Sequence, residues 1–130
     1  MRLILTSIVC MTLALPAVAK PPLREVSEID DGLMAIAIAD EIRKNCDDLQ
    51  PRMVRAYRQI KALEKRAKAL GYSETEIDDY VKSDKEKKRM RGKAEIWLTT
   101  QGVNPKDTSA LCKFGRDDIS RGGPVGYFLR

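Results

Sequence analysis

Two cysteines, Cys46 and Cys112, are the residues of this sequence whose chemistry is most sharply defined. A third cysteine, Cys10, lies inside an N-terminal apolar stretch typical of a secretory signal and would leave with it. Two cysteines in an oxidising compartment are expected to form a disulfide, which would stabilise a fold of this size by about 4 kcal/mol. The alternative is a redox or catalytic thiol, but the sequence has no Cys-x-x-Cys motif and no histidine base.

The sequence contains no histidine. This excludes Ser/His and Cys/His catalysis, His-ligated zinc and haem with an axial imidazole, and two cysteines are too few for an iron–sulfur cluster. We therefore expect a protein that is not an enzyme and uses no metal or other cofactor. The rival class is a small hydrolase that works with carboxylates alone, for which the helical acids are Glu41, Glu64 and Glu95.

Adjacent aspartates occur four times and invite a general acid/base interpretation. Neighbours on a helix point in different directions, however, and three of the pairs fall near expected helix starts, where carboxylates cap free amides. The spacing of a calcium-binding loop is also missing. We expect capping or solvation at all four pairs, which are residues 30–31, 47–48, 78–79 and 117–118.

The densest charge lies in residues 82–93, where seven basic residues meet two acidic ones. This stretch has neither aromatics to stack nucleic-acid bases nor an apolar face to enter a membrane. It is either a solvated helix face or a surface for an anionic partner, expected to be another envelope protein or an anionic surface and not nucleic acid. The outer face of the preceding long helix is basic as well. The candidate partner residues are Lys85, Lys87, Lys88, Arg89, Arg91 and Lys93.

Helices are expected to position these groups. Asp30 or Asp31 is the candidate cap of the first helix, Ser73 and Ser83 open capping boxes, and Asn104 precedes a proline at a helix start. The alanine-rich run at residues 34–39 has the length of a buried strand, but its caps and polar continuation favour a helix. The expected helices cover residues 32–46, 51–70, a short segment from 74, 84–101 and 105–119.

Apolar side chains at helical spacing predict the contacts between these helices. In the second helix, a 3-4-3-4-3 pattern predicts one apolar seam. Trp97 in the fourth helix is expected to be a core anchor. The seam consists of Met53, Ala56, Ile60, Leu63, Ala67 and Leu70.

The chain is accordingly divided into a signal peptide (residues 1–19), a flexible leader (20–29), a helical domain (30–121) and a glycine-rich apolar tail (122–130). The tail carries Tyr127, Phe128 and Leu129, whose burial would stabilise the fold. We expect the tail to fold back on the helical core near Trp97 and not to project as a partner peptide.

Several short motifs of the mature chain stand out together: Cys46, Gly71 to Ser73, Gly102 to Pro105, Leu111 to Arg116, Ile119 and Gly126 to Arg130. They resemble an uncharacterised family of small exported alphaproteobacterial proteins, known only as a domain of unknown function. The resemblance runs from about residue 29 onward, and some members are labelled as a subunit of the NADH dehydrogenase. The missing cluster ligands speak against the chemistry of an iron–sulfur subunit.

These observations predict an all-α bundle of four to five helices with one disulfide and an irregular C-terminal tail. The expected function is that of a non-catalytic periplasmic or secreted binding or accessory protein without a transmembrane segment after signal cleavage. The alternatives are the carboxylate hydrolase and an envelope structural protein or stress-protective chaperone.

Overall fold

The structure, a computed structural model, describes residues 19–130. Five α-helices and two short 3-10 helices make up this part of the chain, and no strand occurs in it. The predicted all-α bundle is therefore confirmed. The expected signal peptide, apart from its last residue Ala19, lies outside the described residues, and so does Cys10. The elements are η1 (Leu23–Glu25), α1 (Ser27–Asn45), α2 (Met53–Ala69), α3 (Glu74–Lys82), α4 (Asp84–Thr100), α5 (Thr108–Ser120) and η2 (Gly126–Phe128).

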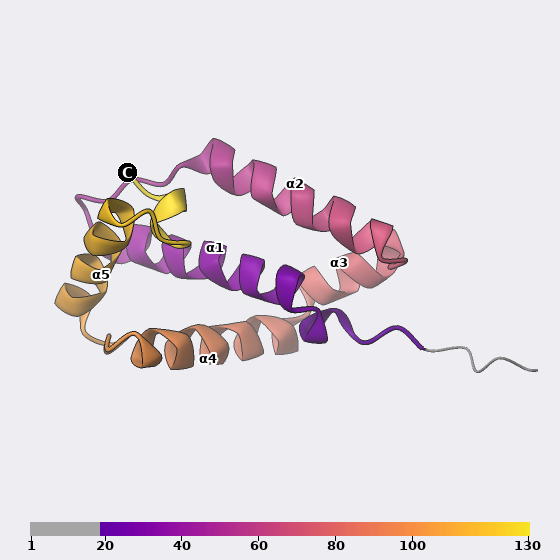
Figure 1. The fold of residues 1–130 in the computed structure, drawn as a ribbon. Helices are drawn as coiled ribbons and strands as arrows, with labels where there is room; N and C mark the ends of the chain where they lie inside the picture. The colour runs from indigo at the N-terminus through magenta and orange to yellow at the C-terminus, as the bar shows by residue number, and fades with distance from the viewer. Residues whose placement is uncertain (1–18) are drawn as a thin grey trace, which may run out of the picture.

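Helix α1 is the centre of the fold. It lies between α2 and α4, while α3 closes one end of the bundle and α5 with the C-terminal tail closes the other (Figure 1). Met34, Ile38 and Ile42 recur every fourth residue along α1 and are buried in the larger core cluster. A smaller cluster at the α3 end gathers Leu23 with residues of α1, α2 and α3.

The predicted disulfide is confirmed. Cys46, which caps the C-terminal end of α1, is bonded to Cys112 in α5. Trp97 of α4 packs edge-on against Phe114 of α5, with ring centroids 5.8 Å apart, as expected of a core anchor. Together these contacts fix α5 across the ends of α1 and α4.

The starts of three helices differ from the predictions, those of α1, α4 and α5. Helix α1 begins at Ser27, and Asp30, an expected cap, lies within its first turn. The capping box at Ser73 is confirmed. Ser83 accepts the amide of Glu86 at the start of α4, but the Glu86 carboxylate does not complete a box because it pairs with arginines. Helix α5 begins at Thr108 with Asp107 as its cap, not at the expected residue 105.

The segment expected to be a flexible leader packs against the bundle. Leu23 and Ile29 are buried, and η1 leads directly into α1. Lys20 donates hydrogen bonds to the carbonyl oxygen of Gly71 (2.7 Å) and to the carboxylate of Glu76. The helical domain therefore extends further toward the N-terminus than the predicted boundary at residue 30.

The C-terminal tail docks on the core, as predicted. Val125, Phe128 and Leu129 are buried, whereas half of Tyr127 remains exposed. The backbone of Arg130 exchanges two hydrogen bonds with that of Gln50, of 2.7 and 2.9 Å. The tail therefore rests on α5 and on the loop between α1 and α2, and only its beginning borders the same hollow as Trp97.

The predicted apolar seam of α2 is only half correct. Leu63 and Ala67 are buried against the smaller core cluster, but Met53 and Ile60 are exposed. The buried pair and the exposed pair lie on neighbouring sides of α2. The side of α2 that contacts the core is narrower than the predicted seam, so Met53 and Ile60 fall outside it. Among the described helices, none combines the length and hydrophobicity needed to cross a bilayer.

Candidate functional site

The predicted basic surface of α4 divides into two groups. Arg89 and Lys93 turn toward α1 and pair with Asp30. Lys85, Lys87, Lys88 and Arg91 are exposed. In the described part of the chain Lys87 lies 3.9 Å from Asp84, and no ion pair joins the other three to a carboxylate. Only the second group is therefore available to a partner.

Asp30 is the centre of a buried charge cluster that joins three helices. Its carboxylate is 1% exposed and accepts hydrogen bonds from the Tyr80 hydroxyl of α3 at 2.5 Å and from both terminal nitrogens of Arg89. The ammonium of Lys93 lies 2.5 Å from Asp30 and 2.5 Å from the exposed Asp31. A charge buried in this way is tolerated because every polar partner is satisfied.

The hydrogen bonds of this cluster shift the pKa values of Asp30, Tyr80 and Arg89. Burial alone raises the pKa of Asp30, but the hydrogen bonds from Arg89, Lys93 and Tyr80 outweigh it and lower the pKa to about 2. Burial and the bond to Asp30 raise the pKa of Tyr80 above its usual range. The bond to Asp30 also raises the pKa of Arg89. An aspartate held this firmly as a carboxylate is suited to fixing helices, not to donating a proton.

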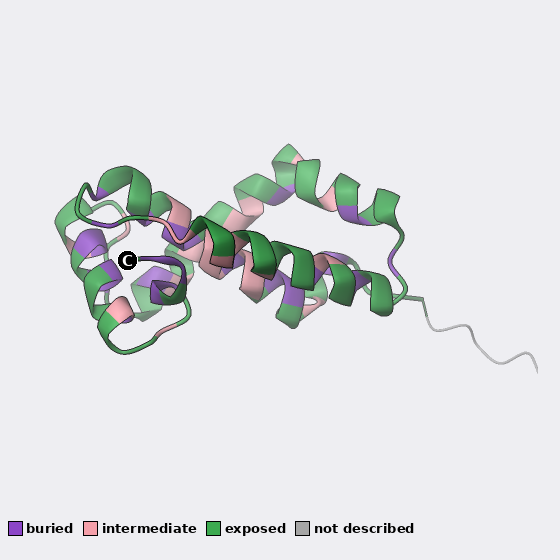
Figure 2. Ribbon diagram, turned by 90° about the horizontal axis from the view of Figure 1, so that it is seen from above, coloured by how far each residue is buried: buried purple, intermediate pink, exposed green. Residues whose placement is uncertain are grey.

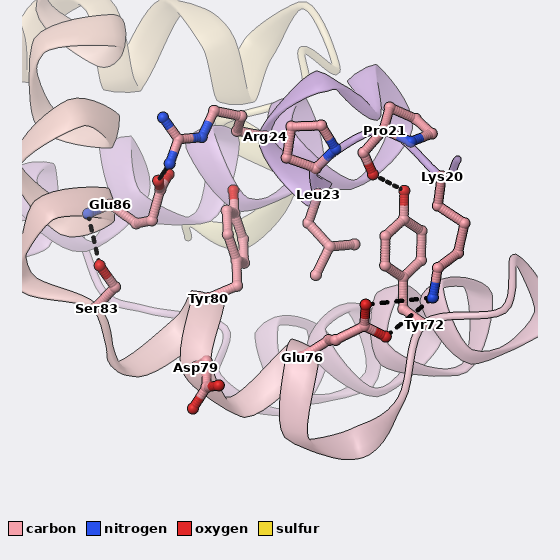
Figure 3. Close-up of a pocket in the computed structure, with 11 residues that line it drawn as sticks. Lys20, Pro21, Leu23, Arg24, Tyr72, Glu76, Asp79, Tyr80, Ser83 and Glu86 are labelled. Carbon is pink, nitrogen blue, oxygen red and sulfur yellow. Dashed lines mark hydrogen bonds and ion pairs between the residues drawn. The ribbon is translucent and has the colours of Figure 1, made fainter. Parts of the chain in front are cut away.

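A second hollow, of about 530 Å³, lies beside this cluster under the N-terminal segment. Figure 3 shows Lys20 with Glu76 on one side of it and Arg24 with Glu86 on the other. The hydroxyl of Tyr72 donates to the carbonyl oxygen of Pro21 and holds the segment in place. Lys20 and Arg24 pair with the lining acids Glu76 and Glu86, so this hollow is part of the packing of the N-terminal segment.

A groove with a volume of about 720 Å³ runs between α1 and α4. Apolar side chains of α1 and α4 form its floor, among them Leu33, Ala37, Met90, Ala94 and Leu98. Tyr80 and Val81 of α3 close one end, and Pro105 and Leu111 close the other. This combination of size and apolar lining is typical of ligand-binding clefts.

The rim of this groove carries the exposed cations of α4. Lys87 and Arg91 line it, whereas Lys85 and Lys88, on the same helix, do not. On the opposite rim, Asp40 is neutralised by Arg43 at 2.8 Å and Lys44 at 2.5 Å. Burial raises the pKa of Asp40, but its bonds to Lys44 and Arg43 outweigh this and lower the pKa. On the α4 rim, Arg91 has no carboxylate partner within residues 19–130 and Lys87 lies 3.9 Å from Asp84, while Glu95 lines the same groove.

The candidate hydrolase residues are only partly brought together. Glu41 and Glu95 line the α1–α4 groove, while Glu64 lies on α2 and pairs with Lys61 and Lys68. Within residues 19–130, no three acidic or cysteine side chains are arranged to hold a metal ion. Two of the paired aspartates form exposed ion pairs, Asp48 with Arg116 and Asp78 with Lys82.

Sequence reasoning missed two buried aspartates. Asp118, fully buried, accepts the backbone amides of Val125 at 2.9 Å and Gly126 at 2.7 Å and so holds the tail. Asp30 continues the four-residue spacing of the apolar residues of α1, and Asp118 follows Leu111 and Phe114 at helical spacing. An acid on the apolar stripe of a helix was the signal available for both.

The fold and its bridge define a class, the small all-α bundles closed by one disulfide. Residues 21–130 match a family described as "Family of unknown function (DUF5333)", and the chain belongs to this family. Comparisons with curated proteins and with solved structures find no match.

Proposed function

We propose that this protein is a non-catalytic accessory protein of the cell envelope, which binds a segment of a partner protein in the groove between α1 and α4. The observation that carries the proposal is the apolar lining of that groove beside the exposed cations Lys87 and Arg91. An amphipathic helix that lays its apolar face into such a groove is a recurring mode of recognition.

The dimensions and charges of the groove describe its occupant. The lining residues of α1 run from Leu33 to Lys44, about 16 Å of helix, which is room for three turns of a partner helix. The apolar floor requires apolar residues at positions i, i+4 and i+7 of that helix. Acidic residues on its flank would meet Lys87 and Arg91, which favours the correct partner and orientation.

A location in the periplasm is part of this proposal. The Cys46–Cys112 bridge supports it, because structural disulfides persist in oxidising compartments. The apolar stretch before the described residues supports export as well. Thiol labelling of the protein in intact cells and in the separated periplasmic fraction tests both points: we expect the protein in that fraction, without reactive thiols. Recovery in the cytoplasm with two reactive thiols would contradict this location.

Site-specific photo-cross-linking in living cells tests the groove. A photoreactive residue in place of Glu95, inside the groove, is expected to give one discrete adduct, and the same residue in place of Lys88 is expected to give none. The double variant Lys87→Glu with Arg91→Glu should abolish the adduct. The matched control, Lys85→Glu with Lys88→Glu, changes the same charge on the same helix and should keep it. Equal loss in both double variants would mean that net charge matters and the groove does not.

A further inference from the structure

Helix α2 exposes an apolar strip that the core does not use. Met53 and Val54 are each 63% exposed, Tyr57 is 62% exposed and Ile60 is 43% exposed. Met53, Tyr57 and Ile60 follow the i, i+4, i+7 spacing of one helix side, and Val54 adjoins them. Figure 2 looks down onto α2 and shows how much of its outward surface is exposed. Large apolar side chains gathered in this way on a protein surface mark an interaction site.

Basic residues accompany this strip. Arg58, Lys61 and Lys65 lie on the outward side of α2, and the only acid of the helix is Glu64. Lys61 pairs with Glu64 at 3.0 Å, and its ammonium also lies 5.9 Å from the centre of the Tyr57 ring. Across residues 19–130, Arg58 and Lys65 form no ion pair with a carboxylate. The strip is therefore apolar and positively charged together.

The packing of α2 separates this strip from its core face. Leu63 and Ala67 are 6% and 2% exposed and anchor the helix on the smaller core cluster. The exposed strip lies on the neighbouring side and mainly on the N-terminal half of α2. It is consequently available without any change in the fold.

We propose that α2 docks this protein on the surface of an anionic lipid bilayer. Met53, Val54 and Tyr57 enter the boundary between headgroups and acyl chains, and Arg58, Lys61 and Lys65 reach the lipid phosphates. A helix with a basic polar face and an adjoining apolar face is the form in which soluble domains bind membrane surfaces. Tyrosine is favoured at that depth because its ring is apolar and its hydroxyl is polar.

Charge complementarity favours anionic lipid over an apolar protein surface as the occupant. Three cations beside four apolar residues match a surface that carries negative charge and hydrocarbon in one plane. The placement is also compatible with the groove, because α1 separates α2 from α4 (Figure 1). A bilayer under α2 would leave α4 on the far side of the molecule.

Vesicle co-sedimentation of the full mature chain tests the proposal. We expect binding to phosphatidylcholine vesicles that contain about a third phosphatidylglycerol, weak binding to pure phosphatidylcholine, and release by added salt. Inorganic phosphate should compete no better than chloride of equal ionic strength. Specific competition by phosphate would identify a site for phosphate itself and overturn the bilayer proposal, as would failure to bind the anionic vesicles.

Two sets of variants separate the apolar from the electrostatic contribution to vesicle binding. Met53→Ser with Tyr57→Ser, and separately Arg58→Glu with Lys65→Glu, should each weaken partitioning about tenfold or more without changing the melting temperature. The control Lys85→Glu with Lys88→Glu carries the same charge change on α4 and should stay within about twofold of the natural protein. Equal weakening in this control, or no weakening in the serine variant, would overturn the proposal. Because the groove variants of α4 test the partner protein separately, the two proposals fail independently.

Discussion

The two ends of the bundle each bury an aspartate, but they use it differently. At the α3 end, Asp30 accepts hydrogen bonds from side chains of α3 and α4, which lie 50 to 63 residues further along the chain. At the α5 end, Asp118 accepts backbone amides only 7 and 8 residues away, and a disulfide lies in the same region of the core. Both ends contain ionised side chains, since Asp118 also pairs with Arg121 at 2.6 Å, but only the α5 end adds hydrogen bonds from backbone amides and a covalent bridge.

This difference predicts what each end is sensitive to. Ionised side chains require their charges, so the α3 end should respond to charge removal and to acid. At the α5 end, the backbone of the tail packs closely against the backbone of α5. A Cβ atom at Gly126 would lie 2.3 Å from the backbone carbon of Asp118. That end should respond to added volume and to reduction of the Cys46–Cys112 bridge.

The largest effect should come from removing the disulfide. Replacing both Cys46 and Cys112 with alanine should lower the free energy of unfolding by about 4 kcal/mol, because the bridge closes a loop over a sequence separation of 66. Urea unfolding followed by circular dichroism measures this. The natural protein in reductant should behave like the double variant, and a loss below about 1 kcal/mol would show that noncovalent packing alone holds the α5 end.

The next effect should come from Asp30→Asn. This substitution keeps the shape of the side chain but leaves Arg89 and Lys93 beside a neutral group, which should cost about 3 kcal/mol. The control is Asp31→Asn, whose exposed carboxylate bonds, among the described residues, to Lys93 alone and should contribute less than about 0.5 kcal/mol. Comparable losses for the two variants would remove the distinction between the ends.

Gly126→Ala should destabilise the α5 end by about 2 kcal/mol, because the tail must shift away from the backbone of Asp118. Gly92→Ala is its matched control. A Cβ atom there meets nothing within 4 Å, and alanine in a helix interior should stabilise α4 by about 0.5 to 1 kcal/mol. Thermal unfolding of both variants should therefore show shifts of opposite sign.

The smallest expected effect is a loss of folding stability at low pH. The pKa of Asp30 is lowered to about 2 in the folded protein from an ordinary value of 3.8, so the stability it contributes is present above pH 3.8 and is lost as the pH falls toward 2. We expect about 1 kcal/mol to be lost through this residue by about pH 3. The measurement is the difference in urea stability between the natural protein and Asp30→Asn, which should narrow on acidification. A constant difference would contradict the role of Asp30.

Regular local patterns explain what the sequence predicted correctly. The capping box at Ser73, the periodic apolar residues of α1 and the two mature cysteines are each visible within a few positions or by simple counting. The docked tail followed from its apolar residues behind glycines. These features need no knowledge of which segments meet in space.

The features that were missed depend on contacts between distant segments. Asp30 looked like a helix cap because the donors that bury it, Arg89 and Lys93, come from another helix. A local signal did exist in α4, where these two residues lie on the same side as Met90 and Trp97. In α2, periodicity identified apolar positions, but it cannot distinguish a side that meets the core from one that faces outward. Met53 and Ile60 were therefore assigned to a seam that they do not form.

Because of Asp118, the opening of the α5 end can be followed by amide hydrogen exchange. The amides of Val125 and Gly126 point at its buried carboxylate, so their hydrogens exchange with solvent only while the tail is detached. Their exchange rates consequently report how often, and for what fraction of time, this end of the molecule opens. Asp30 binds side-chain protons alone, which exchange too fast to follow in this way. A buried aspartate thus makes the opening rate of the α5 end measurable by hydrogen exchange. The buried aspartate of the α3 end provides no amide whose exchange reports its opening.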